Sequence, residues 1–423
     1  MIVAHLGPPL GRTGGPGGYL AQLRAALEAF GSGGHDVRLP APAPQSPRST
    51  LRPSVRARAL QGLRRLRRTV AQPPDYYRPS MSELVRMGGE LDGMIARAWR
   101  DVQHEIAPSL EQAIGADAAV IVAHDAPSAE AALERRGPHQ QVWLLMHSPM
   151  PLGLYLGWCW GVPDRPWTEV AAFPDVQRWM TKELRIIERV DRVLIPCREA
   201  VEELVRIAAR FGPALSGAEE LMTGASGPPV SSSAVAGRRR WGLPANRPVG
   251  LYLGNAQPYR GLDTLLAGLD RLQADGGPPG VVAVAGCPPD QLPLRRRLRA
   301  LGSVSDVGDL LASVDFVINV NRFSLFDLST IEALEAGRPL LMHETGGNRR
   351  FAALGAGAVM LPSLDPGAIA RGLAEMFAMT PEVRGRLGAA SRACYADHLS
   401  LAHLRNRHVA LYDGAGAAAG AAR

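Results

Sequence analysis

The chain has few cysteines, little lysine and no long apolar run. Its cysteines lie far apart without a Cys-x-x-Cys pair, so neither a zinc knuckle nor a disulfide framework is expected; they are Cys159, Cys197, Cys287 and Cys394. No segment supplies the ~18 uncharged apolar residues of a membrane-spanning helix. The N-terminal residues 1–10 lack a basic stretch followed by an apolar run, and are typical of a first strand rather than a signal peptide. These absences favour a protein of the reducing cytoplasm.

The composition is that of a globular protein with two domains. A length of 423 residues exceeds one ordinary core, so two domains of roughly 200 residues are expected. The 46% hydrophobic and 21% charged residues fit a folded chain rather than a disordered or fibrous one. The net charge of +7 is concentrated in one segment, because nine arginines lie between Arg38 and Arg68. Without a recognisable binding module, this basicity does not indicate a nucleic-acid partner.

Apolar strands and helical segments alternate along the first half, which indicates βαβ units and a parallel sheet. The expected strands and helices are residues 1–6, 20–30, 35–40, 118–123, 142–146, 192–196 and 198–209. Together they predict a Rossmann-like domain over residues 1–235. A Gly-, Pro- and Ser-rich stretch at 223–240, without helix or strand periodicity, is the expected linker.

The same rhythm restarts after the linker and predicts a second Rossmann-like domain over residues 236–400. Its expected strands are 249–255, 281–286, 314–320 and 339–344, and its expected helices are 260–272, 294–302 and 329–337. A terminal helix at 401–412 and a disordered tail at 413–423 complete the chain. Two such domains facing each other form a cleft, and a cleft that closes on its ligand excludes water.

The segment from Val317 to Asn348, VINVNRFSLFDLSTIEALEAGRPLLMHETGGN, is the most informative. It predicts a buried strand, a loop, a helix that carries Glu332, a second strand and a Gly-Gly turn. This order places a carboxylate and two turns at the carboxyl edge of a parallel sheet, where open α/β sheets bind nucleotides.

This arrangement resembles the nucleotide-sugar site of the retaining glycosyltransferases of family 4, and the resemblance covers most of residues 1–412. It implies an α/β fold of two Rossmann-like domains facing each other across a cleft, the GT-B fold. The loop at Gly14 and Gly15 corresponds to the family's glycine pair beside the donor diphosphate or acceptor. A helix N-terminus that follows such a loop can bind phosphate. His147, at the end of an apolar strand, corresponds to a histidine beside the transferred sugar.

The resemblance also assigns the donor site, with two departures. Arg260 corresponds to the second of two cations that neutralise the diphosphate, whereas Asn255 replaces the first. Glu332 corresponds to the glutamate that receives the ribose hydroxyls, whereas Ser324 replaces the other glutamate of the family signature. Asp327 is the nearest carboxylate that could substitute for it.

Backbone N–H groups at Asp327 and Leu328 are placed to meet the diphosphate. Arg322, Arg349 and Arg350 are candidate spare cations that could restore the missing charge. His124 and Asp125 match a family pair that closes a strand, and we expect a structural role for them.

Two segments point toward the acceptor. Trp158, Trp160 and Trp167 follow His147, and such rings either stack on sugars or flat acceptors or belong to the core. The basic segment Arg48–Arg68 has the spacing of an amphipathic helix, which either contacts an anionic membrane or ligand or is a basic loop without such a role.

The resemblance implies transfer of a sugar, with retention, from a GDP- or UDP-linked donor to a small-molecule acceptor. It implies no obligatory metal or other cofactor, and no Asp-x-Asp motif is present. The GC-rich composition favours an acceptor from secondary metabolism, such as an antibiotic. Three alternatives stay open: a cell-envelope lipid or polysaccharide transferase, a sugar-nucleotide 2-epimerase on the same fold, and a non-catalytic subunit. The sequence leaves the oligomeric state open.

Overall fold

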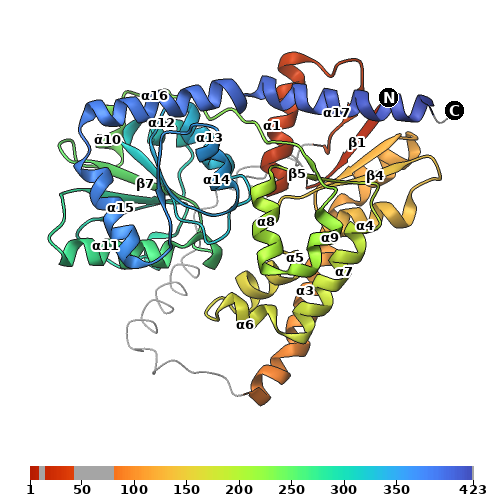
Figure 1. The fold of residues 1–423 in the computed structure, drawn as a ribbon, viewed down its shortest axis with the longest axis horizontal. Helices are drawn as coiled ribbons and strands as arrows, with labels where there is room; N and C mark the ends of the chain where they lie inside the picture. The colour runs from red at the N-terminus through yellow and green to blue at the C-terminus, as the bar shows by residue number, and fades with distance from the viewer. Residues whose placement is uncertain (9–14, 42–80, 422–423) are drawn as a thin grey trace, which may run out of the picture.

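Two parallel six-stranded sheets organise the molecule in the computed structural model, which describes residues 1–8, 15–41 and 81–421 (Figure 1). The first sheet has the order β2-β1-β3-β4-β5-β6 and the second β12-β11-β10-β7-β8-β9. All pairings are parallel. The expected pair of Rossmann-like domains is therefore confirmed.

Short apolar strands form the centre of the first sheet. All four residues of β3 are buried, as expected for a parallel strand covered by helices on both faces. The strands are β1 (Ile2–Leu6), β2 (Asp36–Arg38), β3 (Val120–Ala123), β4 (Gln141–Leu145), β5 (Arg192–Ile195) and β6 (Glu219–Glu220). Its helices are α1 (Gly15–Phe30), α3 (Met81–Gly115), α4 (Ala126–Arg135), α5 (Leu152–Leu156), α6 (Trp167–Ala171), α7 (Pro174–Ile187), α8 (Arg198–Ile207) and α9 (Gly212–Leu215), with a π-helical turn at Gly157–Gly161 and a 3-10 turn at Ala209–Phe211.

The second sheet is built in the same way. Its strands are β7 (Val249–Leu253), β8 (Val281–Ala285), β9 (Leu298–Gly302), β10 (Phe316–Asn319), β11 (Leu340–His343) and β12 (Ala358–Leu361). Its helices are α10 (Ala234–Arg240), α11 (Leu262–Ala274), α12 (Val307–Ser313), α13 (Leu328–Glu335), α14 (Gly346–Ala353), α15 (Pro366–Ala378) and α16 (Pro381–His398), with 3-10 turns at Pro258–Arg260 and Pro289–Gln291.

Two local predictions, one in the second domain and one in the linker before it, were wrong. The residues 294–302, expected as a helix, contain the edge strand β9, which pairs with β8 and leaves Arg299 exposed. Pairing with a buried neighbour outweighs the helical spacing of its leucines and arginines. The expected linker 223–240 ends in helix α10, whose first turn is capped by the Ser233 hydroxyl. The expected boundary after residue 235 thus falls inside this helix.

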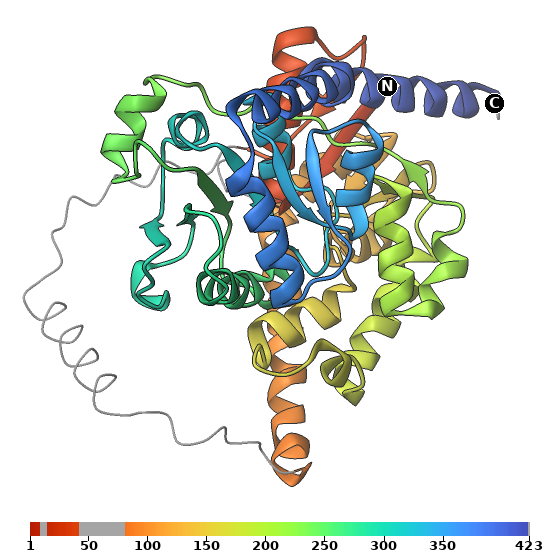
Figure 2. The same ribbon diagram turned by 60° about the vertical axis from the view of Figure 1, so that its left-hand side comes forward.

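The C-terminal helices join the two domains. Helix α16 lies on the second domain, and α17 (Leu401–Ala421) then crosses to pack beside α1 of the first (Figures 1 and 2). The expected disordered tail was wrong for residues 413–421, because the helix does not end at residue 412. Burial of Tyr412 and Ala415 against the first domain holds the segment. The alanines that follow favour continuation of the helix.

Hydrophobic and ionic contacts bring the domains together. Phe323, from the second domain, is buried in the core cluster of the first. The edges of Trp158 and Trp167 meet its ring at centroid distances of 6.2 and 5.4 Å. Arg349 pairs with Glu202 of α8 at 2.9 Å. The carboxyl edge of the second sheet therefore lies against the first domain.

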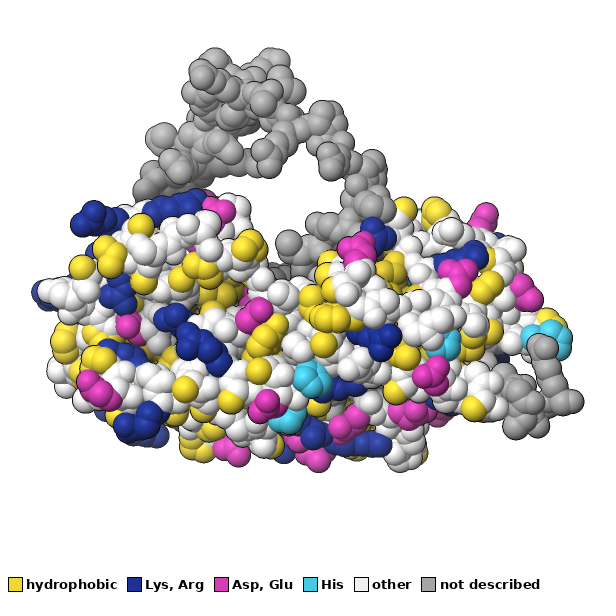
Figure 3. Space-filling view, turned by 90° about the horizontal axis from the view of Figure 1, so that it is seen from above, with side chains coloured by type: hydrophobic (Ala, Val, Ile, Leu, Met, Phe, Trp, Pro, Cys, Tyr) yellow, Lys and Arg dark blue, Asp and Glu magenta, His cyan; other side chains and the backbone are white. Residues whose placement is uncertain are grey.

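Charges of both signs are interspersed over the face seen in Figure 3. The basic segment Arg48–Arg68 lies outside the described residues, and so its expected membrane contact stays a prediction. Among the described helices, none combines the length and apolarity that a membrane crossing requires.

Candidate nucleotide-sugar site

The segment from Val317 to Asn348 folds as predicted, into β10, a loop, α13, β11 and the start of α14. Its Gly-Gly turn fixes the loop. The N–H of Gly347 donates to the carbonyl of Ser324 at 3.0 Å. Gly346 has a φ of +43°, and a Cβ there would lie 1.9 Å from the same carbonyl oxygen. Only glycine fits, because any side chain would push the loop away.

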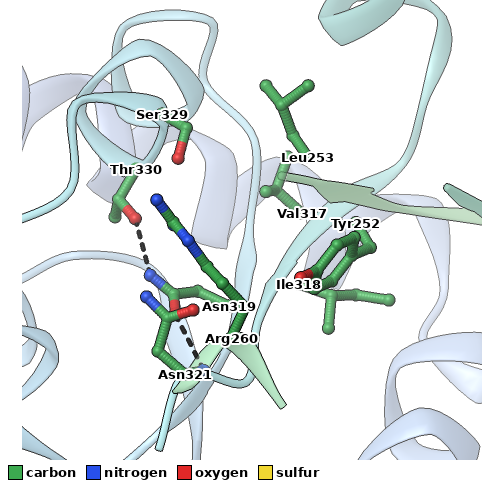
Figure 4. A pocket seen from close by; sticks show the side chains of 9 residues that line it. All are labelled: Tyr252, Leu253, Arg260, Val317, Ile318, Asn319, Asn321, Ser329 and Thr330. Carbon is green, nitrogen blue, oxygen red and sulfur yellow. Dashed lines mark hydrogen bonds between the residues drawn. The ribbon is translucent and has the colours of Figure 1, made fainter. Parts of the chain in front are cut away.

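Arg260 lies over this edge of the sheet, at the end of a 3-10 turn after β7 (Figure 4). Its Nη1 donates to Oδ1 of Asp327 at 3.1 Å, and its side chain is mostly covered. Its Nε is buried and has no hydrogen-bond partner among the described residues. The guanidinium is therefore only partly engaged by Asp327.

A small pocket opens beside Arg260, and Figure 4 shows the guanidinium directed toward Ser329 and Thr330. The pocket is lined by Tyr252, Leu253, Arg260, Val317, Ile318, Asn319, Asn321, Ser329 and Thr330. Gly261, next in the chain, has a φ of +69°, and a Cβ there would lie 2.1 Å from the carbonyl oxygen of Val320. The backbone at Gly261 therefore passes close to the loop after β10, which places Arg260 beside that loop.

Asp327 is the centre of a polar cluster. Its Oδ2 accepts from Ser324 Oγ at 3.0 Å, Asn321 Nδ2 at 2.8 Å and Asn319 Nδ2 at 3.2 Å. Ser324 and Asp327 are therefore in direct contact. The carboxylate of Asp327 thus lies beside Ser324, the position at which the resemblance implies a glutamate, and it is paired with Arg260.

Asn319 and Asn321 were not predicted as site residues. Asn319 ends the apolar strand β10 and Asn321 follows it, at the edge that binds ligands in α/β sheets. Polar residues in the pattern VINVN were the available signal.

Glu332 lies one helical turn after Leu328 on the same face of α13. It accepts no hydrogen bond from any described residue, whereas Glu335 accepts one from Tyr395 Oη at 2.9 Å and one from the N–H of Gly227. Burial, followed by repulsion from Glu335, raises the pKa of Glu332 to about 7. A half-buried carboxylate without a partner is suited to accept the hydroxyls of a ribose.

The first domain meets this site through α1. A Cβ at Gly18 would lie 3.0 Å from Cδ1 of Leu328, so the first turn of α1 contacts the first turn of α13. Gly15 begins α1 with a φ of +50° and open space around it. Gly14 lies outside the described residues. Two helix N-termini therefore converge at one place, which suits an anion.

His147 follows β4 and lies beside the same turn of α1. Its ring centroid is 4.8 Å from that of Tyr19 and 5.0 Å from that of His124, on which it stacks. Its Nε2 is 2.7 Å from Nδ1 of His124. Burial lowers the pKa of His147 to about 3, so the imidazole is neutral. Asp125, next to His124, caps helix α4 through the N–H of Ser128, which is a structural role as expected.

Other predicted residues lie away from this cluster or are already engaged. Trp158 is buried, with its indole N–H donating to the carbonyl of Arg165 at 2.8 Å, which favours the packing alternative, and its acceptor contact stays a prediction. Trp160 is 63% exposed, and its role stays a prediction. Asn255 is exposed after β7 and caps its own turn through Gln257 N–H at 3.2 Å.

The three candidate spare cations are not spare. Arg322 forms a two-pronged ion pair with Asp263 at 2.9 and 2.6 Å. Arg350 bridges to Glu199 and Glu220 of the first domain at 2.9 and 2.7 Å, and Arg349 is used at the same interface. These arginines join elements of the fold, and they do not replace the charge missing at Asn255.

No cluster of three His, Cys, Asp or Glu side chains that could hold a metal occurs in the described part of the chain. The polar groups at the site are amides, hydroxyls, one arginine and two carboxylates. They can bind an anion through Arg260 and helix N-termini, and hydroxyl groups through Glu332.

Known proteins share this architecture and part of the sequence. Residues 247–379 match the model of the family "Glycosyl transferases group 1". A sucrose-phosphate synthase from Thermosynechococcus elongatus is similar in structure over 99% of this chain and 100% of its own, with a TM-score of 0.63 and 18% identity. The fold is that of the GT-B glycosyltransferases.

Two further relatives bear on the site. The Anabaena protein Alr3699/HepE, solved in complex with UDP-glucose, matches over 98% of this chain and 100% of its own, with a TM-score of 0.59 and 14% identity. A D-inositol 3-phosphate glycosyltransferase from Streptomyces griseus is 28% identical over an alignment of 305 residues. The match covers 59% of this chain and 62% of the relative. The chain thus spans about three fifths of this curated relative. These matches show that the chain is similar to glycosyltransferases in its fold and in part of its sequence.

Proposed function

We propose that this protein is a retaining glycosyltransferase that moves a sugar from a UDP- or GDP-linked donor to a small-molecule acceptor. One observation carries the proposal. Arg260, the Ser324–Asp327 pair and Glu332 of the second domain lie at the carboxyl edge of its sheet, where α1 of the first domain meets α13, and His147 packs on Tyr19 of α1.

The donor would lie along this edge. Glu332 would accept the ribose hydroxyls, and the N–H groups that begin α13 would meet the diphosphate together with Arg260. Relatives solved with UDP-glucose and UDP share the fold, which supports a nucleotide-sugar donor. Asn255 leaves Arg260 as the principal cation for the departing phosphate.

The chemistry needs stabilisation of the nucleoside diphosphate as it leaves, because its negative charge grows while the bond to the sugar breaks. Arg260 and the converging helix N-termini would supply this stabilisation in a site partly closed to water. Asp327 lies beside Ser324, where it would face the positive charge that develops on the sugar. His147, a neutral imidazole, would contact the sugar by a hydrogen bond rather than attack it.

The acceptor would enter from the first domain, near His147 and the N-terminus of α1. We propose that this acceptor is a small molecule of secondary metabolism. We also propose that the protein acts in the cytoplasm and needs no resident cofactor. A curated relative is named for transfer to an inositol phosphate, which supports a small polar acceptor.

A non-catalytic nucleotide-binding subunit is the second candidate. The ion pair between Arg260 and Asp327 favours it, because each charge is partly neutralised by the other. A sugar-nucleotide 2-epimerase would need the same donor site and would act without an acceptor.

Thermal melting against UDP, GDP, ADP, CMP and dTDP tests the donor site. A rise with one nucleotide would identify the base and direct assays with its sugars, and NMR of the product would give the anomeric configuration. The absence of a rise with every nucleotide, in a folded sample, would overturn the proposed donor site. Binding of nucleotide sugars without turnover toward any acceptor or water would favour the non-catalytic subunit.

A further inference from the structure

A buried chain of hydrogen bonds runs from His147 to the C-terminal helix α17. Its consecutive distances are 2.7 Å from His147 to His124, 2.9 Å to His5, 2.8 Å to Tyr412, 2.7 Å to His408 and 2.6 Å to Tyr19. We call these six residues the His–Tyr chain. Apart from His147, each is at most 2% exposed. Four imidazoles and two phenols thus form a continuous hydrogen-bonded chain that is buried in the protein, apart from its half-buried end at His147.

Every link uses one specific atom of each ring, which restricts where the protons lie. A neutral imidazole has one N–H and one bare nitrogen, and a phenol has one O–H. A proton placed on one ring therefore determines the next, and the whole chain has only two ordered states. In one state all donors point toward His147, and in the other all point away from it.

The two states differ at both ends. When donors point toward His147, Tyr19 Oη donates to His408 Nε2, and the last proton is on His147 Nδ1. When they point away, His147 Nδ1 is bare and the last proton is on Tyr19 Oη. Tyr19 Oη has no second partner among the described residues. A buried donor would then lack an acceptor, which is unfavourable by roughly tenfold or more in an equilibrium.

His147 Nδ1 also makes no hydrogen bond with any described residue, but its side chain is only half-buried, so an N–H there can be met by water or a ligand, unlike the covered hydroxyl of Tyr19. Resting on the function proposed above, we infer that the His–Tyr chain fixes His147 as a hydrogen-bond donor through Nδ1, and that Tyr412 and His408 of α17 are its positioning residues. The ligand atom that faces it is an oxygen that accepts, such as a sugar hydroxyl or ring oxygen. His147 in this state cannot remove a proton from the acceptor.

This inference gives α17 a role beyond packing. The helix is the last element of the chain, and it reaches the first domain after α16 has covered the second. It thereby connects the end of the polypeptide to a side chain at the site. Burial lowers the pKa values of His5 and His124 well below the usual range of histidine and lowers that of His408 to about 3, so that neutral rings are expected throughout.

Nitrogen NMR of histidine-labelled protein tests the inference directly, because protonated and bare imidazole nitrogens have well-separated shifts. We expect His147 of the unliganded protein to carry its proton on Nδ1 by roughly tenfold over Nε2. In Tyr412→Phe and in Tyr19→Phe, the shortened chain ends in an unpaired nitrogen whichever way it runs. The preference should therefore fall toward an even mixture in both variants.

Val409→Ala is the matched control. Val409 lies on α17 beside His408, packs against Gly33 and belongs to no link of the chain. Its truncation should lower the melting temperature and leave the His147 tautomer unchanged. A proton on Nε2 in the wild type, an even mixture there, or an unchanged tautomer in both phenylalanine variants would overturn the inference.

Turnover separates this inference from the proposed function. In an active enzyme, Tyr412→Phe should lower kcat about twofold with an unchanged KM for the donor, because the donating tautomer falls from about ten in eleven molecules to about one in two. A merely destabilising change would leave kcat per folded molecule unaltered. If no transfer is found while the tautomer behaves as expected, the proposed function fails and the chain's effect on His147 stands. Full kcat in a folded Tyr412→Phe protein would refute the positioning role.

Discussion

The charge of Glu332 should destabilise the unliganded protein, and its removal should therefore stabilise the fold while weakening the donor site. The pKa of this carboxyl is raised from 4.5 to about 7, first by burial and then by Glu335. That difference corresponds to about 3 kcal/mol. The folded protein holds the proton more tightly than the unfolded chain, so the penalty is absent below pH 4.5, grows as the pH rises to about 7 and is complete above it.

Glu332→Gln keeps the shape of the protonated side chain. We expect it to raise the free energy of unfolding by up to about 3 kcal/mol at pH 8 and to change it little at pH 4.5. Urea titrations at the two pH values measure this difference. The same variant should show a smaller melting shift with the nucleotide that stabilises the wild type, because an amide cannot receive two ribose hydroxyls as a carboxylate does.

Glu335→Gln is the matched control, one turn later on the same helix. Glu335 accepts hydrogen bonds from Tyr395 and from the backbone of Gly227, so its replacement should destabilise the protein at pH 8 by about 1–3 kcal/mol. The two variants should thus change stability in opposite directions. If Glu332→Gln is no more stable than the wild type at pH 8, the carboxylate is not held against its charge and the reasoning fails.

Three further outcomes follow from the site. Arg260→Ala should weaken nucleotide binding tenfold or more in calorimetry, since a charge-assisted hydrogen bond contributes about 1.5–3 kcal/mol; unchanged affinity would remove Arg260 from the donor site. Ser324→Glu places a second carboxylate against Asp327 and should lower the melting temperature, and adding Asp327→Asn should restore it; equal stability of the single variant and the wild type would mean that the serine position does not face Asp327. Gly261→Ala, with its φ of +69° and a carbonyl 2.1 Å from the new Cβ, should cost more than about 1 kcal/mol in urea unfolding, and a smaller loss would contradict the close approach to Val320.

Much of the architecture could be predicted because its signals are local. Alternating apolar strands and amphipathic helices are visible in the sequence, and parallel pairing follows from them. Strand β9 (Leu298–Gly302), which lies within the expected helix 294–302, was missed for the opposite reason. Its leucines and arginines have helical spacing, and only the neighbouring strand β8 makes them an edge strand. Residues 413–421 were expected to be disordered, because the contact of Tyr412 and Ala415 with the first domain is not visible in an Ala- and Gly-rich tail.

The candidate site could be predicted in part. The resemblance to the family 4 transferases indicated Arg260 and Glu332, with Asp327 as the carboxylate nearest Ser324, and the structure brings Arg260 and Asp327 into contact. The burial of Trp158 could not be predicted, because the sequence cannot show that Phe323 of the other domain covers its ring. The candidate spare cations were misjudged for a similar reason, since their carboxylate partners lie far away in the sequence.

The sequence by itself determined the two parallel sheets, the glycine-dependent turns and the types of residue available for binding phosphate and hydroxyl groups. These follow from local periodicity and from backbone conformations that only glycine adopts. Tertiary structure alone decided which charges pair, which rings are covered and how His147 is linked to α17. The residues of the His–Tyr chain are separated by up to 407 positions, and their hydrogen bonds exist only once the last helix packs against the first domain.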